Sequence, residues 1–365
     1  MSTIKVNSIV PPNVGEGVSI DGLQMPTAGA FSNRNLIING AMQVSQRGTS
    51  NTGQTVTAYS ACDRFFELIS GLGTWTVEQS TDAPAGFSNS LKLTCTTADA
   101  SPSAGDVILV SQRIEAQNLQ HLSYGTVNAA TTIISFWVKS NKTGGASFDI
   151  LEPDGGNRLF SQSYNINAAD TWEYKTIEIP GDTAGNINND NGSGFNVEWW
   201  LNSGSTFNGG SHQTAWGTLS QSNRNASNLG VGGTVNDYYQ ITGVQLEVGS
   251  KATAFEHESY GQTLAKCQRY FEGVPAGGPF NQADSICWSG YTLINSANYA
   301  VKAFTVEKRA IPTVVMTDSS VQTGFNAATL DVGQAGTRGI RGEGTANVTS
   351  GGRYYFIHFT ADAEL

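Results

Sequence analysis

The sequence predicts a mainly β protein with four parts: a short extended N-terminal anchor, a jelly-roll-type β-sandwich, one helix and a smaller C-terminal β domain. Three observations predict this fold class. Short segments with period-two alternation recur along most of the chain, and no long helical period interrupts them. The chain has 42 Gly, and Gly- and Asn-rich stretches such as residues 185–196 separate the segments. The apolar residues are rich in the β-branched and aromatic types that strands prefer.

Residues 1–33 differ from the rest of the chain. Two strand-like pieces, around residues 4–9 and 18–20, are interrupted by Pro11 and Pro12 and are followed by a turn over residues 22–26. Pieces this short bury no core of their own, so they must pair with another chain or dock on a partner. We predict an N-terminal anchoring segment; a free tail is the alternative.

The sandwich domain is predicted over residues 34–258. The segment 132–139 places Ile134, Phe136 and Val138 on one face and Ser135, Trp137 and Lys139 on the other. Residues 174–179 and 244–248 alternate in the same way. One apolar and one polar face is typical of antiparallel sandwich strands, which favours a jelly roll.

A connecting helix is predicted over about residues 260–272, within the segment 259–273. Ser259 and Gln262 have the spacing of a capping box. Apolar residues then follow at helical spacing, and Gly273 stands where a C-terminal cap is expected. The members of this stripe are Tyr260, Leu264, Cys267 and Phe271. Residues 274–365 return to alternating segments and are predicted to form the smaller β domain.

Charge and composition exclude several classes of protein. The chain carries 20 Lys and Arg against 30 Asp and Glu, a net charge of −10, and the basic residues form no run. This excludes a nucleic-acid partner. No apolar run is long enough for membrane insertion, and the first residues have no apolar core of a signal peptide. The four cysteines form no Cys-x-x-Cys pair, so we expect free thiols.

Two neighbouring ionisable residues, Asp63 and Arg64, are predicted to take part in structural ion pairs that fix a loop. We expect Arg47 or Arg64 to brace carboxylates such as Glu115 or Glu247, because a planar guanidinium satisfies several oxygens at once.

Aromatic residues are dense between residues 199 and 239, and we predict a glycan-binding surface there. Flat rings stack on the apolar faces of sugars while polar side chains bind the hydroxyls; ordinary packing in a core or subunit interface is the alternative. Successive strand residues face opposite sides, so one member of each adjacent pair can be exposed. The candidates are Trp199, Trp200, Phe207, Trp216, Tyr238 and Tyr239.

Metal binding and catalysis are not predicted. Asp182 and Asp190 flank an Asn-rich loop, but their spacing does not match an EF-hand, so we expect a solvated turn and no cofactor. A glycosidase needs two carboxylates across a cleft, and no stretch pairs acidic residues on in-facing positions. No Gly-x-Ser-x-Gly elbow occurs. We therefore expect a non-enzymatic protein.

Several motifs resemble those of bacteriophage tail-fibre and related virion proteins. Residues 34–48 read RNLIINGAMQVSQRG and residues 59–65 read YSACDRF, which are similar to two stretches of that family. Residues 110–115 (VSQRIE), 135–140 (SFWVKS), 244–256 (VQLEVGSKATAFE) and 264–271 (LAKCQRYF) follow in the family's order. Ala254 replaces a usual Pro, and residues 309–313 (RAIPT) resemble a recurrent motif of the last domain.

The resemblance implies a virion structural protein with a jelly roll like that of carbohydrate-binding modules. It implies a homotrimer, made in the host cytoplasm and displayed on the tail or particle surface. Its N-terminal segment would contact other virion proteins, and its β domain would bind bacterial surface glycans for host attachment. Two alternatives stay open: a purely architectural capsid decoration or connector, and a polysaccharide-depolymerising tailspike.

Overall fold

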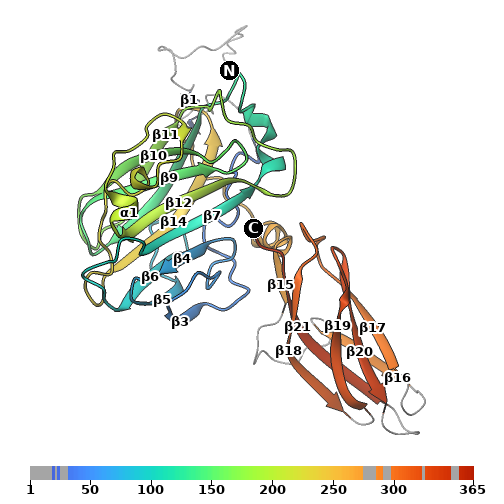
Figure 1. Ribbon diagram of the computed structural model, residues 1–365. Coiled ribbons are helices and arrows are strands. Elements are labelled where there is room, and N and C mark those ends of the chain that lie inside the picture. Colours follow the sequence, from blue (N-terminus) through green and yellow to red (C-terminus); the bar gives the residue numbers. More distant parts are fainter. Residues whose placement is uncertain are drawn as a thin grey trace, which may run out of the picture.

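The computed structural model describes residues 32–273, 285–290, 297–322, 325–346 and 353–365, together with two short strands near the N-terminus. The protein is mainly β, with few and short helices (Figure 1), so the predicted fold class is confirmed.

The larger part is a sandwich of two six-stranded antiparallel sheets. One, the β9 sheet, has the order β13 (Gly217–Thr218), β10 (Arg158–Ile166), β9 (Gly144–Glu152), β12 (Ser193–Ser203), β7 (Val107–Glu115) and β4 (Phe66–Ser70). The other, the β8 sheet, has the order β11 (Glu173–Ile179), β8 (Thr132–Ser140), β14 (Tyr238–Val248), β6 (Ser90–Thr97), β5 (Thr74–Ser80) and β3 (Ser50–Gln54).

The sandwich core lies between these sheets. Alternate residues of each strand point inward, so Phe136 of β8 meets Trp199 of β12 with ring centroids 5.8 Å apart. Strands that are distant in the sequence are neighbours in the sheets, for example β7 with β12 and β6 with β14. This strand order is the jelly-roll order that the alternating segments predict.

Three short helical turns lie outside the sheets of the sandwich. The 3-10 helix η1 (Ala116–Leu122) follows β7. The single-turn helix α1 (Ser205–Asn208) and the 3-10 turn η2 (Gln221–Asn223) belong to the long connection between β12 and β14, which lies against the outer face of the β9 sheet.

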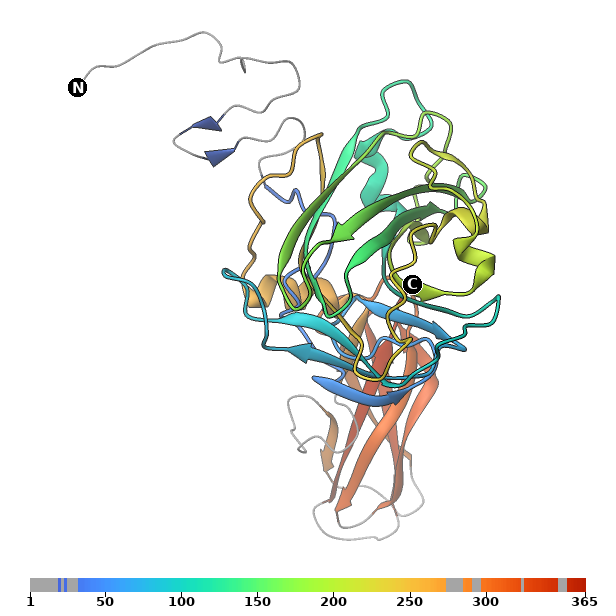
Figure 2. The ribbon, with the colours of Figure 1, turned by 90° about the vertical axis from the view of Figure 1, so that its left-hand side faces the viewer.

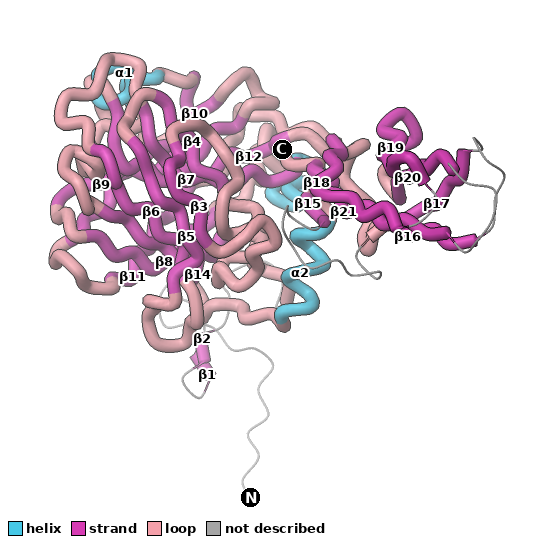
Figure 3. The backbone as a smooth tube through the Cα atoms, turned by 90° about the horizontal axis from the view of Figure 1, so that it is seen from below, coloured by secondary structure: helices cyan, strands magenta, loops and turns pink. Residues whose placement is uncertain are grey.

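The connecting helix α2 runs from Tyr260 to Gln268 and begins with the predicted capping box, since Ser259 and Gln262 exchange both bonds. It ends earlier than expected. Phe271 leaves the helix and pairs with the C-terminal strand, and Gly273 lies in that strand pair rather than in a cap. Tyr260 is exposed, and Thr263 and Cys267 are the buried residues of the helix. Figure 3 shows α2 between the sandwich and the C-terminal strands.

The C-terminal strands form a separate pair of small sheets that extends away from the sandwich (Figure 2). In one sheet β21 (Arg353–Asp362) pairs with β15 (Phe271–Gly273), β16 (Ile286–Gly290) and β18 (Thr313–Gln322). The other has the order β17 (Ala297–Ala303), β20 (Gly339–Ala346) and β19 (Phe325–Gly336). Their own apolar cluster includes Ile286, Ile340, Ile357 and Phe359.

Near the N-terminus, β1 (Ser19–Ile20) pairs antiparallel with β2 (Leu23–Gln24). The rest of the predicted anchoring segment lies outside the described residues, so its role stays a prediction.

Candidate functional site

Three of the predicted glycan-binding residues lie in the interior. Trp199, Trp200 and Tyr239 are each 0% exposed, so none offers a ring surface to a sugar. Trp199 and Tyr239 point into the sandwich core, as alternation allows for one member of each pair. Trp200 points to the opposite face of β12, as expected, but other residues cover it. The role predicted for these three residues does not fit their placement.

The cover over Trp200 is the connection between β12 and β14, residues 204–230, which we call the covering segment. Phe207 packs on Trp200 with ring centroids 5.3 Å apart. Arg224 lies above the same indole and binds two carboxylates that face each other across β9 and β12, Asp149 at 2.8 Å and Glu198. The outer face of the β9 sheet is therefore closed by the chain itself.

The other three candidates keep part of their surface exposed. Phe207 and Trp216 are half-buried, and Trp216 donates its indole N–H to the backbone oxygen of Pro180 at 2.6 Å. Tyr238 lies on the outer face of the β8 sheet, where its hydroxyl contacts Asp170 at 2.5 Å. These residues lie on different faces and do not form one surface.

A set of half-buried and exposed rings instead crosses the outer face of the β8 sheet. Tyr174 of β11 and Trp137 of β8 are cross-strand partners with ring centroids 5.3 Å apart. Phe87 follows, and its ring lies 5.0 Å from Phe255 and 5.4 Å from His257. We call these five residues the aromatic row.

A bulge in β14 joins the two halves of the aromatic row. Gly243 has a φ of +61°, and a Cβ there would lie 2.7 Å from Phe87 Cζ and 3.0 Å from Trp137 Cδ1. Only glycine therefore lets both rings approach this strand. All five rings are half-buried or exposed, and Tyr174 is 44% exposed.

Polar side chains border the aromatic row. Asp82 accepts hydrogen bonds from Lys139 Nζ at 2.8 Å and from the Trp172 indole at 3.1 Å. Lys139 also lies 6.0 Å from the Trp172 ring. The charges of Asp82 and Lys139 compensate each other, so this border offers hydrogen bonds without net charge. Apolar rings beside fixed polar groups are the chemistry that stacks on and hydrogen-bonds to a neutral sugar.

The sequence contains a pattern that marks the aromatic row, although the predicted glycan-binding residues lie between residues 199 and 239. Alternation in residues 132–139 already places Trp137 on the polar face with Ser135 and Lys139. An aromatic residue on the polar face of a strand is the useful feature, whereas the local density of aromatics around residue 199 marks the core.

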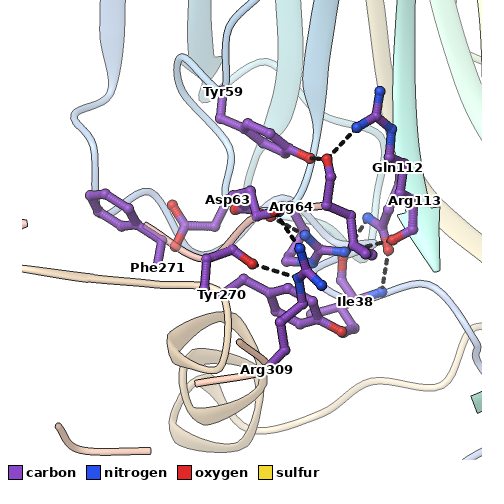
Figure 4. Close-up of polar contacts among 12 residues, drawn as sticks. Ile38, Tyr59, Asp63, Arg64, Gln112, Arg113, Tyr270, Phe271 and Arg309 are labelled. Atoms are coloured by element: carbon purple, nitrogen blue, oxygen red, sulfur yellow. Dashed lines mark hydrogen bonds and ion pairs between the residues drawn. The ribbon is translucent and has the colours of Figure 1, made fainter. Parts of the chain in front are cut away.

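Four of the five predicted ion-pair residues lie at the joint between the sandwich and the C-terminal strands; Glu247 does not. Arg64 is buried, stacks 3.5 Å from the Tyr270 ring and binds Glu364. Arg47 binds Asp362 at 3.1 Å and Glu364 at 3.3 Å, with Phe271 3.6 Å away. Figure 4 shows this joint together with Arg309, whose guanidinium donates to the backbone oxygens of Ala363 and Glu364.

The partners of these residues differ from those expected. Glu115 binds Arg269 at 2.7 and 2.8 Å and accepts the Tyr270 hydroxyl, and Glu247 lies 3.4 Å from Arg34. Asp63 accepts the backbone N–H of Gln46 at 2.8 Å. Spacing in the sequence identified the charged residues, but the ion-pair partners of Glu115 and Glu247 lie more than 150 residues away along the chain.

Two further predictions concern metals and membranes. Asp182 is bound by Arg158, and Asp190 accepts the N–H of Gly192 at 2.8 Å, which makes it part of a turn. Among the residues that the structure describes, no group of three or more His, Cys, Asp or Glu could hold a metal ion. The same part of the chain has no helix long and apolar enough to cross a membrane.

Comparisons with known proteins find similarity in structure only. No protein-family model and no curated protein matches the chain. An enzymatically active domain of tailspike protein 4 from bacteriophage CBA120 is 15% identical, with a TM-score of 0.31; the match covers 59% of this chain, which spans only 21% of that one. A sugar-binding protein from Bacteroides thetaiotaomicron, described as putative, is 14% identical over 59% of this chain and 100% of that one, with a TM-score of 0.33.

A family 11 carbohydrate-binding module from a Clostridium thermocellum cellulase is 11% identical over 57% of this chain and 98% of that one, with a TM-score of 0.28. These scores are too low to support a conclusion about function. The fold of this chain is therefore assigned from its strand order.

Proposed function

We propose that this protein is a non-enzymatic, glycan-recognising component of a bacteriophage virion, a tail fibre or similar appendage. The aromatic row on the β8 sheet would contact bacterial surface glycans. Five neighbouring rings, of which Tyr174 and His257 are exposed and the other three half-buried, stand beside a polar border and support this role. The virion role itself rests on the motifs between residues 34 and 272 that resemble the family.

The arrangement favours recognition of an extended, neutral glycan. The rings run from β11 across β8 and the β14 bulge to residues 255–257, so successive sugars could stack along them. A homotrimer with its N-terminal segments on the particle would carry three such rows. Modest single-site affinity would then be amplified by roughly 10²-fold or more through multivalency.

We propose that binding occurs without hydrolysis. Asp149 and Glu198 are a pair of carboxylates that lie opposite each other as cross-strand partners on β9 and β12. Both are buried and both bind Arg224 beneath the covering segment. A glycosidase requires one carboxyl to donate a proton and the other to act on the sugar, with a cleft between them. Here one guanidinium occupies the space between the two groups.

An architectural role without any ligand is the second candidate. The burial of Trp199 and Trp200 favours it, since these rings serve packing in the sandwich. In that case the aromatic row would be covered by another virion protein rather than by a glycan.

Incubation of the purified protein on an array of bacterial surface polysaccharides separates these functions. We expect protein to be retained without release of new reducing ends, and retention to be lost in Trp137→Ala. New reducing ends would establish a depolymerase instead. If the array shows neither retained protein nor new reducing ends, and the wild-type protein binds to isolated virion components, the architectural role is favoured.

A further inference from the structure

A hollow bordered by cationic side chains lies beside α2, and the proposed function does not use it. It is a cleft of about 650 Å³ between residues 33–38, the end of β7 with η1, and α2. This volume is within the range of small-ligand sites. Leu36, Ile38 and Ile114 supply its apolar part. We call it the cationic cleft.

The charges around the cationic cleft differ from those of the chain as a whole. Arg113, Lys266 and Arg269 are among its lining residues, and none of the described residues that line it is acidic. The whole chain has 30 acidic and 20 basic residues, whereas, among the described residues that line this cleft, the only charged ones are basic. Their carboxylate partners, Glu115 for Arg269 and Glu258 for Lys266, are not among the lining residues, so the wall itself presents cationic groups to a ligand.

Two of these cations are accessible to a ligand. Lys266 is 38% exposed and Arg269 is 32% exposed. Arg269 uses two N–H groups on Glu115, which is buried behind it, and keeps the remaining guanidinium donors. Arg113 is fixed by a bond to the backbone oxygen of Leu365, and Figure 4 shows it next to Gln112, whose amide is bound to Ile38.

Amide side chains complete the wall. Asn33, Gln117 and Asn118 line the cleft and are exposed. Amides donate to and accept from hydroxyl groups, whereas guanidinium and ammonium groups make strong charge-assisted bonds to carboxylates. An apolar floor, amides and cations together match a sugar that carries a carboxylate.

We propose that the cationic cleft is a second binding site, specific for an acidic saccharide, such as a uronic acid unit of a bacterial surface polysaccharide. It is distinct from the aromatic row, whose stacked rings suit a neutral sugar. This inference deepens the proposed function but does not share its residues, so each site can fail without the other.

Trigalacturonic acid and neutral galactotriose are suitable probes, because a carboxylate distinguishes their sugar units. Binding is measured by NMR titration and calorimetry on the full chain in 20 mM and 500 mM NaCl. We expect trigalacturonic acid to shift the resonances of Asn118 and Lys266, to bind more weakly at high salt, and to be preferred over galactotriose at this cleft.

Variants on α2 decide between a specific site and general charge attraction. Lys266→Gln should weaken trigalacturonic acid binding by about tenfold, the value of one charge-assisted bond. Glu258→Gln should strengthen it, because Glu258 is the ion-pair partner of Lys266. Lys251→Gln, at an exposed lysine outside the cleft, is the matched control and should change binding less than about twofold.

The proposal is overturned if trigalacturonic acid does not bind at millimolar concentration, or if Lys251→Gln and Lys266→Gln weaken it equally. It is also overturned if Tyr174→Ala abolishes this binding, since the acidic sugar would then occupy the aromatic row. If Tyr174→Ala loses galactotriose or polysaccharide binding but keeps trigalacturonic acid binding, the result concerns the aromatic row and the proposed function. The proposal for the cationic cleft then stands.

Discussion

Two neighbouring carboxyl groups in the sandwich have opposite electrostatic environments. Burial, with a further contribution from nearby Asp182, raises the pKa of Glu152 to about 7. Burial acts in the same direction on Asp182, but hydrogen bonds from Arg158 outweigh it and lower the pKa of that carboxyl. One arginine therefore neutralises one of the two acids, and Glu152 keeps its proton into the neutral range.

This difference predicts a pH dependence of stability. The folded protein holds the Glu152 proton more tightly than the unfolded chain, so the free energy of unfolding should fall as pH rises from about 4.5 to 7. Glu152→Gln imitates the protonated acid and should remove about 2–3 kcal/mol of this decline. Urea unfolding of both proteins between pH 5 and 8 measures the difference. Parallel curves would show that Glu152 does not titrate in this range.

At the scale of elements, the covering segment is fastened to the β9 sheet by the guanidinium of Arg224, whose side chain is 11% exposed. Arg224 compensates both Asp149 and Glu198 and packs 4.8 Å above Trp200. Ser161 and Ser147 add bonds of 2.8 to 3.0 Å to the segment at Gln213, Asn223 and Ser227. The covering segment therefore buries the outer face of the β9 sheet, which the alternation of residues in the strands alone would leave exposed to solvent.

Arg224→Met should destabilise the protein by about 3–5 kcal/mol, because it leaves two buried carboxylates without a partner. Combining it with Asp149→Asn and Glu198→Gln should restore most of that loss, since the uncompensated charges are gone. Denaturant unfolding of the two variants makes the comparison. A loss below about 1 kcal/mol in Arg224→Met would indicate that water already reaches these carboxylates.

Local patterns in the sequence predicted the elements well and their partners poorly. The strand at residues 132–139 and the capping box at Ser259 follow from spacing within a few residues, and both occur as expected. The cover over Trp200 comes from residues 204–230, and the strand pairing that ends α2 early comes from β21. No short-range spacing encodes such contacts. This is why burial of Trp200 and the partners of Arg47 and Arg64 could not be read from the chain.

At the scale of the whole molecule, the joint between the sandwich and the C-terminal strands is built from arginines stacked on aromatic rings. Glu364 is only 5% exposed and binds both Arg47 and Arg64. Arg309, from the motif at residues 309–313, joins Asn191 of the sandwich to the backbone of residues 363–364. We expect these buried pairs to fix the orientation of the C-terminal strands relative to the sandwich.

Glu364→Ala should uncouple the two parts. It leaves Arg64 buried without its carboxylate, a loss of about 3–5 kcal/mol that falls on the joint. Calorimetry should then resolve two unfolding transitions where the wild type shows one, with the C-terminal strands unfolding first. Asp362→Ala, at the more exposed partner of Arg47, should shift the transition only slightly. Two transitions already present in the wild type would contradict a rigid joint.

The proposed function depends on glycan binding by the aromatic row on the β8 sheet. Tyr174→Ala and Tyr299→Ala test it most directly, because these tyrosines are 44% and 48% exposed but lie in the row and in the C-terminal strands respectively. With a polysaccharide retained on the array, binding isotherms should show at least a tenfold loss for Tyr174→Ala and none for Tyr299→Ala, as expected when one stacked ring is removed. Equal affinity of both variants and the wild type would show that the polysaccharide does not bind at the aromatic row.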